Sequence, residues 1–352
     1  MRIRGACGAN IRRGRALTVV LGLLLAGCSL GGGGDDDAGR KVVLVTHDSF
    51  AMSKDVLDAF TKKTGITIDV RKLGDAGALT NQLVLTKGNP IGDVAYGVDN
   101  TFASRALDEG VFEPYEVKVD GPAEYAVDDT HRLTAVDLGD VCLNVDPAAL
   151  QAKGVPEPTT YADLVKPAYK DMLVVEDPAT SSPGLAYLLG SIAKLGDGWQ
   201  DYWRALKANG VKVVSGWEEA YTQDFSGSSG KGPRPVVVSY ASSPAAELDE
   251  AGNPRTKAVL DTCFRQVEYA GVLKGAAHAD DAKKVMDFLL SADFQAQVAD
   301  QMYVYPTRKG VALPEAWQKA APLPTASAEL PAKEIQQNRE RWISEWRGIV
   351  EG

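Results

Sequence analysis

The amino-acid sequence predicts an α/β protein built from two successive blocks of alternating strands and helices. Short apolar runs with the two-residue period of strands alternate with segments whose apolar residues recur at helical spacing. Of the 352 residues, 45% are apolar and 24% are charged, as is usual for a globular protein. This length allows two or three domains, or one large domain, and a substantial buried core.

The first block contains three strand–helix pairs, which predict a parallel sheet with helices on its faces. Ser53 has the position of a helix N-cap, apolar residues follow it at helical spacing, and Gly65 ends that helix. Residues 66, 68 and 70 are apolar and alternate with polar residues, as in a strand. We expect strands at 41–46, 66–70 and 93–98, and helices between 53 and 65, at 78–86 and at 102–107.

The second block begins near residue 140 and continues the alternation to the end of the chain. Its final segment is a charged amphipathic helix that carries Trp342 and Trp346. The expected strands are 141–145, 172–176, 211–214, 236–239 and 267–273. One expected helix starts at 161–164. The other expected helices are 183–195, 198–208, 280–290, 292–299 and 332–350.

The N-terminus has the features of a secreted lipoprotein. Five arginines precede an apolar run at 16–26, which is too short for the ~20 residues of a membrane-spanning helix and fits a signal peptide. Residues 25–28 (Leu-Ala-Gly-Cys) resemble a bacterial lipobox. We therefore expect a signal peptide at 1–27, lipid on Cys28, a flexible tether at 28–40, and a location on the outer face of a bacterial plasma membrane. General and twin-arginine export both remain open.

Charge and composition exclude several classes of function. The net charge is −9, and because residues 1–27 hold five arginines and no acid, the remainder carries −14. Such an acidic chain is unsuited to general nucleic-acid binding. Three histidines and four cysteines leave little material for a metal site, so we expect neither metal nor cofactor. In an oxidising compartment Cys142 and Cys263 form either a disulfide or two separate buried thiols.

Two α/β blocks behind a lipid anchor indicate an extracytoplasmic solute-binding protein, whose ligand binds between two lobes that close by hinge motion. Ligands of open α/β sheets bind beyond the C-terminal ends of the strands. The segments there supply aromatic rings near a carboxylate, which suit a flat cation, and hydroxyl residues at helix starts, which suit a polar or anionic group. The candidate ligand-binding residues are His47, Asp48, Ser49, Asp99, Thr180, Ser181, Ser182, Trp217, Tyr221, Tyr240, Ser242 and Tyr303.

The motifs at these positions resemble those of the periplasmic thiamine-binding proteins of ABC transporters. They are Asp-Ser-Phe at 48–50, Val-Asp-Asn at 98–100, Asp-Pro-x-Thr-Ser-x-Pro-Gly at 177–184, Gly-Trp-x-Glu-Ala-Tyr at 216–221, Ser-Tyr-x-x-Ser-Pro at 239–244 and Tyr-Pro at 305–306. The resemblance extends from about residue 42 to 350. It implies a type II-like two-lobed periplasmic-binding-protein fold with thiamine or a thiamine phosphate in the interlobe cleft, an ABC permease as partner, and no enzymatic activity.

The resemblance also implies roles for individual residues. Asp48 matches a carboxylate near the pyrimidine amino group or the cation, and Trp217, Tyr221 and Tyr240 match aromatic positions around the rings. Ser181 and its neighbours match a helix start that receives the hydroxyethyl or phosphate end. The sequence departs from the family at three places. His47 stands where a Tyr is usual, a family Trp has no counterpart in 51–56, and Tyr303 stands where a Trp is usual.

Alternative functions and the division into lobes complete the sequence predictions. A binder of a polyamine, ferric ion or phosphonate in the same fold remains open. A secreted hydrolase is disfavoured because the sequence contains neither Gly-x-Ser-x-Gly nor His-Glu-x-x-His.

The predicted first lobe comprises 41–137 with 268–306, and the second comprises 138–267 with 307–352. Cys142 and Cys263 lie beside the predicted crossings between lobes.

Overall fold

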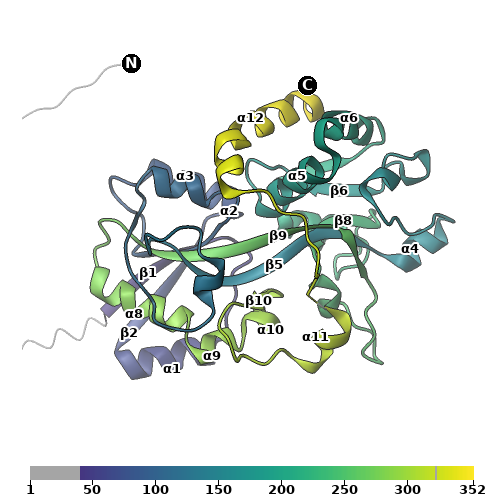
Figure 1. Ribbon diagram of the computed structural model, residues 1–352. Coiled ribbons are helices and arrows are strands. Elements are labelled where there is room, and N and C mark those ends of the chain that lie inside the picture. Colours follow the sequence, from purple (N-terminus) through teal and green to yellow (C-terminus); the bar gives the residue numbers. More distant parts are fainter. Residues whose placement is uncertain (1–39, 322) are drawn as a thin grey trace, which may run out of the picture. The chain divides into compact units, whose positions relative to one another are not determined.

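The computed structural model describes residues 40–321 and 323–352, and within these residues ten strands form one mixed sheet (Figure 1). The main strand order is β2-β1-β3-β9-β5-β8-β6-β7, with β4 paired to β9 and β10 paired to β5. The strands are β1 (Arg40–Thr46), β2 (Ile66–Lys72), β3 (Val94–Asp99), β4 (Phe112–Glu113), β5 (Thr134–Val145), β6 (Leu173–Glu176), β7 (Lys212–Val214), β8 (Val236–Tyr240), β9 (Lys257–Leu273) and β10 (Tyr305–Pro306).

Twelve α-helices accompany the sheet in the same part of the chain. They are α1 (Lys54–Thr64), α2 (Ala76–Leu85), α3 (Ala103–Asp108), α4 (Pro147–Ala152), α5 (Ser182–Leu195), α6 (Trp199–Ala208), α7 (Trp217–Glu219), α8 (Ala279–Leu289), α9 (Ala292–Gln295), α10 (Val298–Met302), α11 (Glu315–Ala320) and α12 (Ala332–Val350). The α/β prediction is therefore confirmed.

The first block has the predicted parallel arrangement, since β1 pairs in parallel with both β2 and β3. Ser53 caps α1 by accepting a hydrogen bond from the Val56 N–H at 3.4 Å. Gly65 ends the helix in a left-handed conformation with φ +71°, which a residue with a Cβ adopts only at a cost. Arg40, predicted as the last residue of the tether, is the first residue of β1 and pairs with Ile66.

The strands β5 and β9 are much longer than predicted and run side by side through the middle of Figure 1. Their pairing is antiparallel, and so is the pairing of β9 with β3, which makes the sheet mixed. Polar residues at the strand centres interrupt the apolar pattern, so the sequence revealed only one end of each strand. Some of these residues form hydrogen bonds across the sheet. The Arg265 Nε–H, for example, donates to Asp140 Oδ1 at 2.8 Å.

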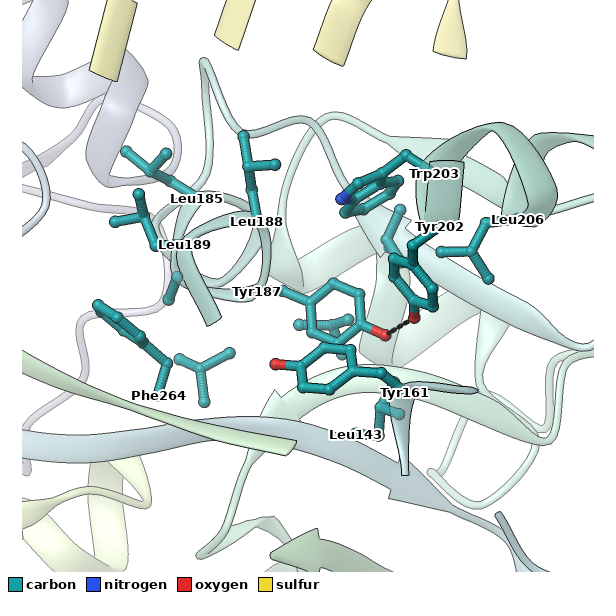
Figure 2. Packing of buried hydrophobic residues seen from close by; sticks show 14 of the residues in the cluster. Leu143, Tyr161, Leu185, Tyr187, Leu188, Leu189, Tyr202, Trp203, Leu206 and Phe264 are labelled. Carbon is teal, nitrogen blue, oxygen red and sulfur yellow. Dashed lines mark hydrogen bonds between the residues drawn. The ribbon is translucent and has the colours of Figure 1, made fainter. Parts of the chain in front are cut away.

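The largest apolar cluster lies around α5, α6 and α12, and Figure 2 shows its aromatic centre. The hydroxyl groups of Tyr187 and Tyr202 are 2.6 Å apart and hydrogen-bonded, so these buried rings keep their polar atoms paired. Trp346 of α12 is fully buried and packs edge-on against Trp203 at 5.5 Å. The amphipathic tail helix predicted from the sequence thus completes this core.

Several local predictions differ from the structure. Residues 161–163 form a 3₁₀ turn rather than an α-helix, and the helix expected at 292–299 is divided into α9 and α10. The sequence analysis did not identify α4, α7, α11, β4 or β10, which are all too short to give a periodic signal. Trp317 of α11 packs edge-on against Tyr305 at 5.2 Å, in the apolar cluster around β1, β3 and α3.

Candidate functional site

A pocket of about 580 Å³ opens beside the carboxyl ends of β1, β2 and β8. This volume is within the ~300–1,000 Å³ range of small-molecule sites. Its wall combines aromatic, acidic and hydroxyl side chains. The lining residues are His47, Ser49, Ala51, Lys72, Asp75, Pro183, Trp217, Glu218, Tyr221, Thr222, Ser229, Tyr240, Ser243, Ala246, Glu247, Arg255, Glu268, Gln301, Met302, Tyr303 and Val304.

One wall of the pocket is aromatic. The rings of Trp217 and Tyr221 are stacked, with centroids 4.9 Å apart and planes 15° from parallel, and Tyr240 approaches Trp217 at 6.5 Å. The Trp217 indole N–H donates to Ser239 Oγ at 2.8 Å, and that oxygen is also 2.7 Å from Ser243 Oγ. These hydrogen bonds fix the orientation of the indole, so the ring faces are positioned by the protein.

The position of the Tyr240 ring is fixed by β5 and by a hydrogen bond from its hydroxyl group. A Cβ on Gly139 would lie 2.7 Å from the Tyr240 ring, so glycine there gives the ring room to lie against β5. The Tyr240 hydroxyl donates to Gln266 Oε1 at 3.3 Å, and Gln266 Nε2 donates to Glu268 Oε1 at 3.2 Å. A polar chain therefore connects the aromatic wall with the acidic floor.

The pair His47 and Glu268 also lines the pocket. His47 Nε2 is 3.3 Å from Glu268 Oε2, which is within ion-pair distance. Burial alone would lower the pKa of His47, but the carboxylates of Glu268, Asp75 and Asp48, of which Glu268 contributes most, outweigh it and the pKa is raised. For Glu268, burial would raise the pKa, and His47 lowers it overall. Both groups thus favour their charged forms.

A second buried acid, Asp137, lies beside Glu268 beneath the pocket. Burial and the nearby Glu268 charge hold the pKa of Asp137 well above its ordinary value. The Tyr96 hydroxyl donates to Asp137. Two carboxyl groups so close together cannot both ionise easily, so the negative charge resides on Glu268, which faces the pocket.

Asp75 caps the start of α2 and also reaches two other segments. Its Oδ1 accepts from the Ala76 N–H at 2.6 Å and from the Ser182 N–H at 3.3 Å, and its Oδ2 accepts from the Trp217 N–H at 3.0 Å. Burial raises the pKa of Asp75, and these N–H groups partly oppose that effect. The N–H groups predicted to cradle a polar end of the ligand are thus bonded to Asp75.

Tyr303 lies at the mouth of the pocket in a left-handed backbone conformation, with φ +56°. For a residue with a side chain this costs about 1–2 kcal/mol. Ser242 Oγ–H donates to the Tyr303 carbonyl oxygen and helps to hold that conformation. The ring is 37% exposed, which makes it the most accessible of the aromatic pocket residues.

The structure brings six of the twelve predicted ligand-binding residues to the pocket wall: His47, Ser49, Trp217, Tyr221, Tyr240 and Tyr303. The other six do not line the pocket, and they are Asp48, Asp99, Thr180, Ser181, Ser182 and Ser242. Asp48 Oδ1 is buried and has no hydrogen-bond partner within residues 40–321 and 323–352.

The hydroxyl residues at the start of α5 bond within the protein. Ser182 Oγ–H donates to Asp99, and Thr180 Oγ1–H donates to the Ser215 carbonyl at 2.7 Å. Ser181 Oγ accepts from the Gly184 N–H at 3.4 Å and caps α5. Burial raises the pKa of Asp99 to about 6, although its hydrogen bonds from Ser182 and Thr101 oppose the shift.

Two important residues were missed by the sequence analysis. Asp75 follows a strand and precedes a helix, which is the same signal that was used for the other strand ends. Glu268 lies inside β9, away from either end of that strand. Its placement depends on strand register, because Glu268 pairs with both Asp99 and Asp137.

Cys142 and Cys263 form a disulfide between β5 and β9, with Cα atoms 4.2 Å apart.

The predicted signal peptide, the lipidated Cys28 and the tether up to residue 39 lie outside the described residues. Within the described ranges, we find no helix with the length and apolarity needed to cross a membrane. The same ranges contain no cluster of three or more His, Cys, Asp or Glu side chains suited to a metal ion.

A mixed sheet with an aromatic and acidic pocket at its strand ends defines a two-lobed α/β solute-binding protein, and comparisons with known proteins agree. The family profile described as bacterial extracellular solute-binding protein matches residues 89–328. The chain belongs to this family, which consists of binding proteins and not enzymes and which acts outside the cytoplasm.

The matches to relatives and to solved structures cover most of the chain. A thiamine-binding periplasmic protein of Brucella abortus is 28% identical over 316 residues, which cover 87% of this chain and 91% of that protein. A solved periplasmic thiamin binding protein has a TM-score of 0.78 and 27% identity, and the match covers 88% of this chain and 96% of that one. The resemblance and the periplasmic-binding-protein fold predicted from the sequence are thus confirmed.

A more distant relative is named for a different ligand. It is a 2-aminoethylphosphonate-binding periplasmic protein of Salmonella paratyphi A, 25% identical over 313 residues, with 84% of this chain and 86% of that protein covered.

Proposed function

We propose that the protein binds thiamine, or a phosphate ester of thiamine, in this pocket and delivers it to an ABC importer. The observation that carries the proposal is the stacked aromatic wall of Trp217 and Tyr221 in one pocket with the carboxylates of Asp75 and Glu268. Thiamine has two flat rings and a permanent positive charge on one of them. Each aromatic face over a cation contributes on the order of 0.5–2 kcal/mol.

The charge of the pocket supports a cationic ligand. The lining includes the acids Asp75, Glu218, Glu247 and Glu268 but only the bases Lys72 and Arg255, beside His47. Arg255 Nη2 already donates to Glu247 Oε2 at 2.9 Å, so its charge is compensated. A cation in the pocket therefore meets a surplus of negative charge, which favours binding and steers association.

We assign direct ligand contact to His47, Ser49, Trp217, Tyr221, Tyr240 and Tyr303. The carboxylate role that the resemblance implies for Asp48 falls to Glu268, which lines the pocket. Asp75 also lines it, but both of its oxygens accept backbone N–H groups. Asp99, Thr180, Ser181, Ser182 and Ser242 support the wall from behind through the hydrogen bonds described above.

Closure of two lobes over the ligand is part of the proposal. We assign 41–137 with 268–306 to the first lobe and 138–267 with 307–352 to the second. The long strands β5 and β9 would then be the main connections. The packing of Trp317 against Tyr305 suggests that α11 moves with the first lobe, although its residue numbers fall in the second.

Anchoring completes the proposed transport role. Lipid on Cys28 would hold the protein at the outer face of the plasma membrane, close to the permease, while the segment 28–39 spans the distance.

Calorimetric titration of the full-length protein in detergent tests the ligand assignment. We expect saturable heat with thiamine, and the phosphate esters added in parallel define the preferred form. Spermidine, ferric citrate and 2-aminoethylphosphonate serve as the competing ligands. Saturable heat with one of these and none with thiamine or its esters would show that the pocket serves another solute.

A further inference from the structure

The Asp75 carboxylate joins three parts of the chain that are distant in sequence. Ser182 and Trp217 are 107 and 142 residues away from it, yet both donate their backbone N–H to its oxygens. Asp75 lines the pocket and is only 9% exposed. Its hydrogen bonds therefore lie at the ligand site and are shielded from water, where charge-assisted bonds are strong.

The neighbouring residues reinforce this junction. The Ala78 N–H donates to the Thr180 carbonyl at 3.1 Å, one turn along α2. A Cβ on Gly77 would lie 2.7 Å from the Thr180 carbonyl carbon, so the two backbones are in direct contact. Ser182 also donates its hydroxyl to Asp99 at the end of β3. The start of α2 and the end of β3 are thus fastened to the start of α5.

The junction connects residues that the proposed boundaries assign to different lobes. Asp75 belongs to the first lobe, and Ser182 and Trp217 belong to the second. Trp217 also carries the indole of the aromatic wall. The hydrogen bond from its backbone N–H to Asp75 therefore fixes the position of the backbone from which the indole extends. The carboxylate consequently acts on ligand binding through the position of Trp217 and through the closure of the lobes.

We infer that Asp75 is a positioning residue of the binding site, whose carboxylate clamps the two lobes together around the ligand and sets the rate of ligand release. This inference rests on the proposed function, since it assumes that the pocket holds thiamine. A ligand can leave only when the clamp opens, whereas entry occurs while it is open. Loss of the clamp should therefore change dissociation more than association.

The substitution Asp75→Asn isolates this role. Asparagine is as good a helix N-cap as aspartate, so its single oxygen still serves α2, but the second oxygen that accepts from Trp217 is lost. Asp93→Asn is a matched control. Asp93 is also a buried acid that accepts two backbone N–H groups, from Val43 at 2.8 Å and His278 at 2.9 Å, and it lies outside the pocket.

Stopped-flow tryptophan fluorescence of the full-length protein with thiamine measures both rates. For Asp75→Asn we expect dissociation to be roughly tenfold to a hundredfold faster and association to change by less than about threefold. Asp93→Asn should leave both rates close to those of the wild type. Unchanged dissociation in a folded Asp75→Asn protein, or an equal effect of Asp93→Asn, would overturn the inference.

Amide hydrogen exchange tests the clamp without any ligand. In the wild type the amides of Ser182 and Trp217 should be protected, and Asp75→Asn should expose them selectively. Unprotected amides at these positions in the wild type would overturn the inference even if the variant failed to fold. If thiamine does not bind but these amides are protected through Asp75, the proposed ligand is wrong and the clamp stands.

Discussion

The indole of Trp217 lies stacked on the ring of Tyr221, with 4.9 Å between their centroids and 15° between their planes. The two residues are four apart at the end of β7, where α7 continues into a π-type turn at Ala220–Asp224. The four-residue spacing places the two rings against each other, and both residues line the pocket.

Replacing Trp217 tests the aromatic wall. Trp217→Ala removes a ring over the proposed cation together with its buried area, so we expect affinity for thiamine to fall roughly tenfold to a few hundredfold. Calorimetry measures this directly. Trp217→Phe keeps a ring face and should lose distinctly less, while equal affinity for all three proteins would argue against stacking on Trp217.

The pair His47 and Glu268 predicts a pH dependence of stability. Since the folded-state pKa of His47 is raised, its contribution is fully present below the ordinary value of 6.5 and is lost as the pH rises through the folded-state pKa. Since the pKa of Glu268 is lowered, its contribution is present above the ordinary value of 4.5 and is lost at lower pH. The pair therefore stabilises most between these two values.

Urea unfolding of the wild type and of His47→Gln measures this effect. The advantage of the wild type in free energy of unfolding should be larger at pH 6 than at pH 9. In a Glu268→Gln background the dependence should largely disappear, because the partner charge is absent. An advantage that grows toward pH 9 would contradict the assignment of the charges.

The disulfide between Cys142 and Cys263 predicts a stability effect. The paired strands β5 and β9 already hold the two residues close in the folded protein, so the bond acts mainly by restricting the unfolded chain. The double substitution to alanine should lower the free energy of unfolding by about 2–4 kcal/mol. Intact-mass analysis after alkylation should find no free thiol at either position before reduction, and two alkylated thiols would contradict the pairing.

The lipid anchor predicts a change of location. Cys28→Ser removes the proposed acceptor of the lipid, so the protein should move from the membrane fraction into the soluble fraction. Fractionation followed by immunoblotting measures the distribution, and Cys7→Ser is the matched control. Retention of the Cys28→Ser protein in the membrane at the wild-type level would place the anchor elsewhere.

The parallel core of β1, β2 and β3 and most of the long helices could be predicted from the sequence. Apolar alternation, the cap at Ser53 and the stop at Gly65 are local signals that act over a few residues. The aromatic residues of the pocket were predictable for a related reason. Tyr240 is the last residue of β8, and Trp217 and Tyr221 lie in the segment that follows β7. The ends of strands in such sheets form ligand sites.

Only the tertiary structure determines which groups the buried acids Glu268 and Asp75 contact. Glu268 became part of the pocket through the register of β9 against β3 and β5, which no local pattern records. Asp75 came to hold Ser182 and Trp217 because α2 packs against the start of α5, more than a hundred residues away in the chain. Local periodicity specifies which face of an element is buried, whereas the partner of a buried charge depends on contacts between elements distant in sequence.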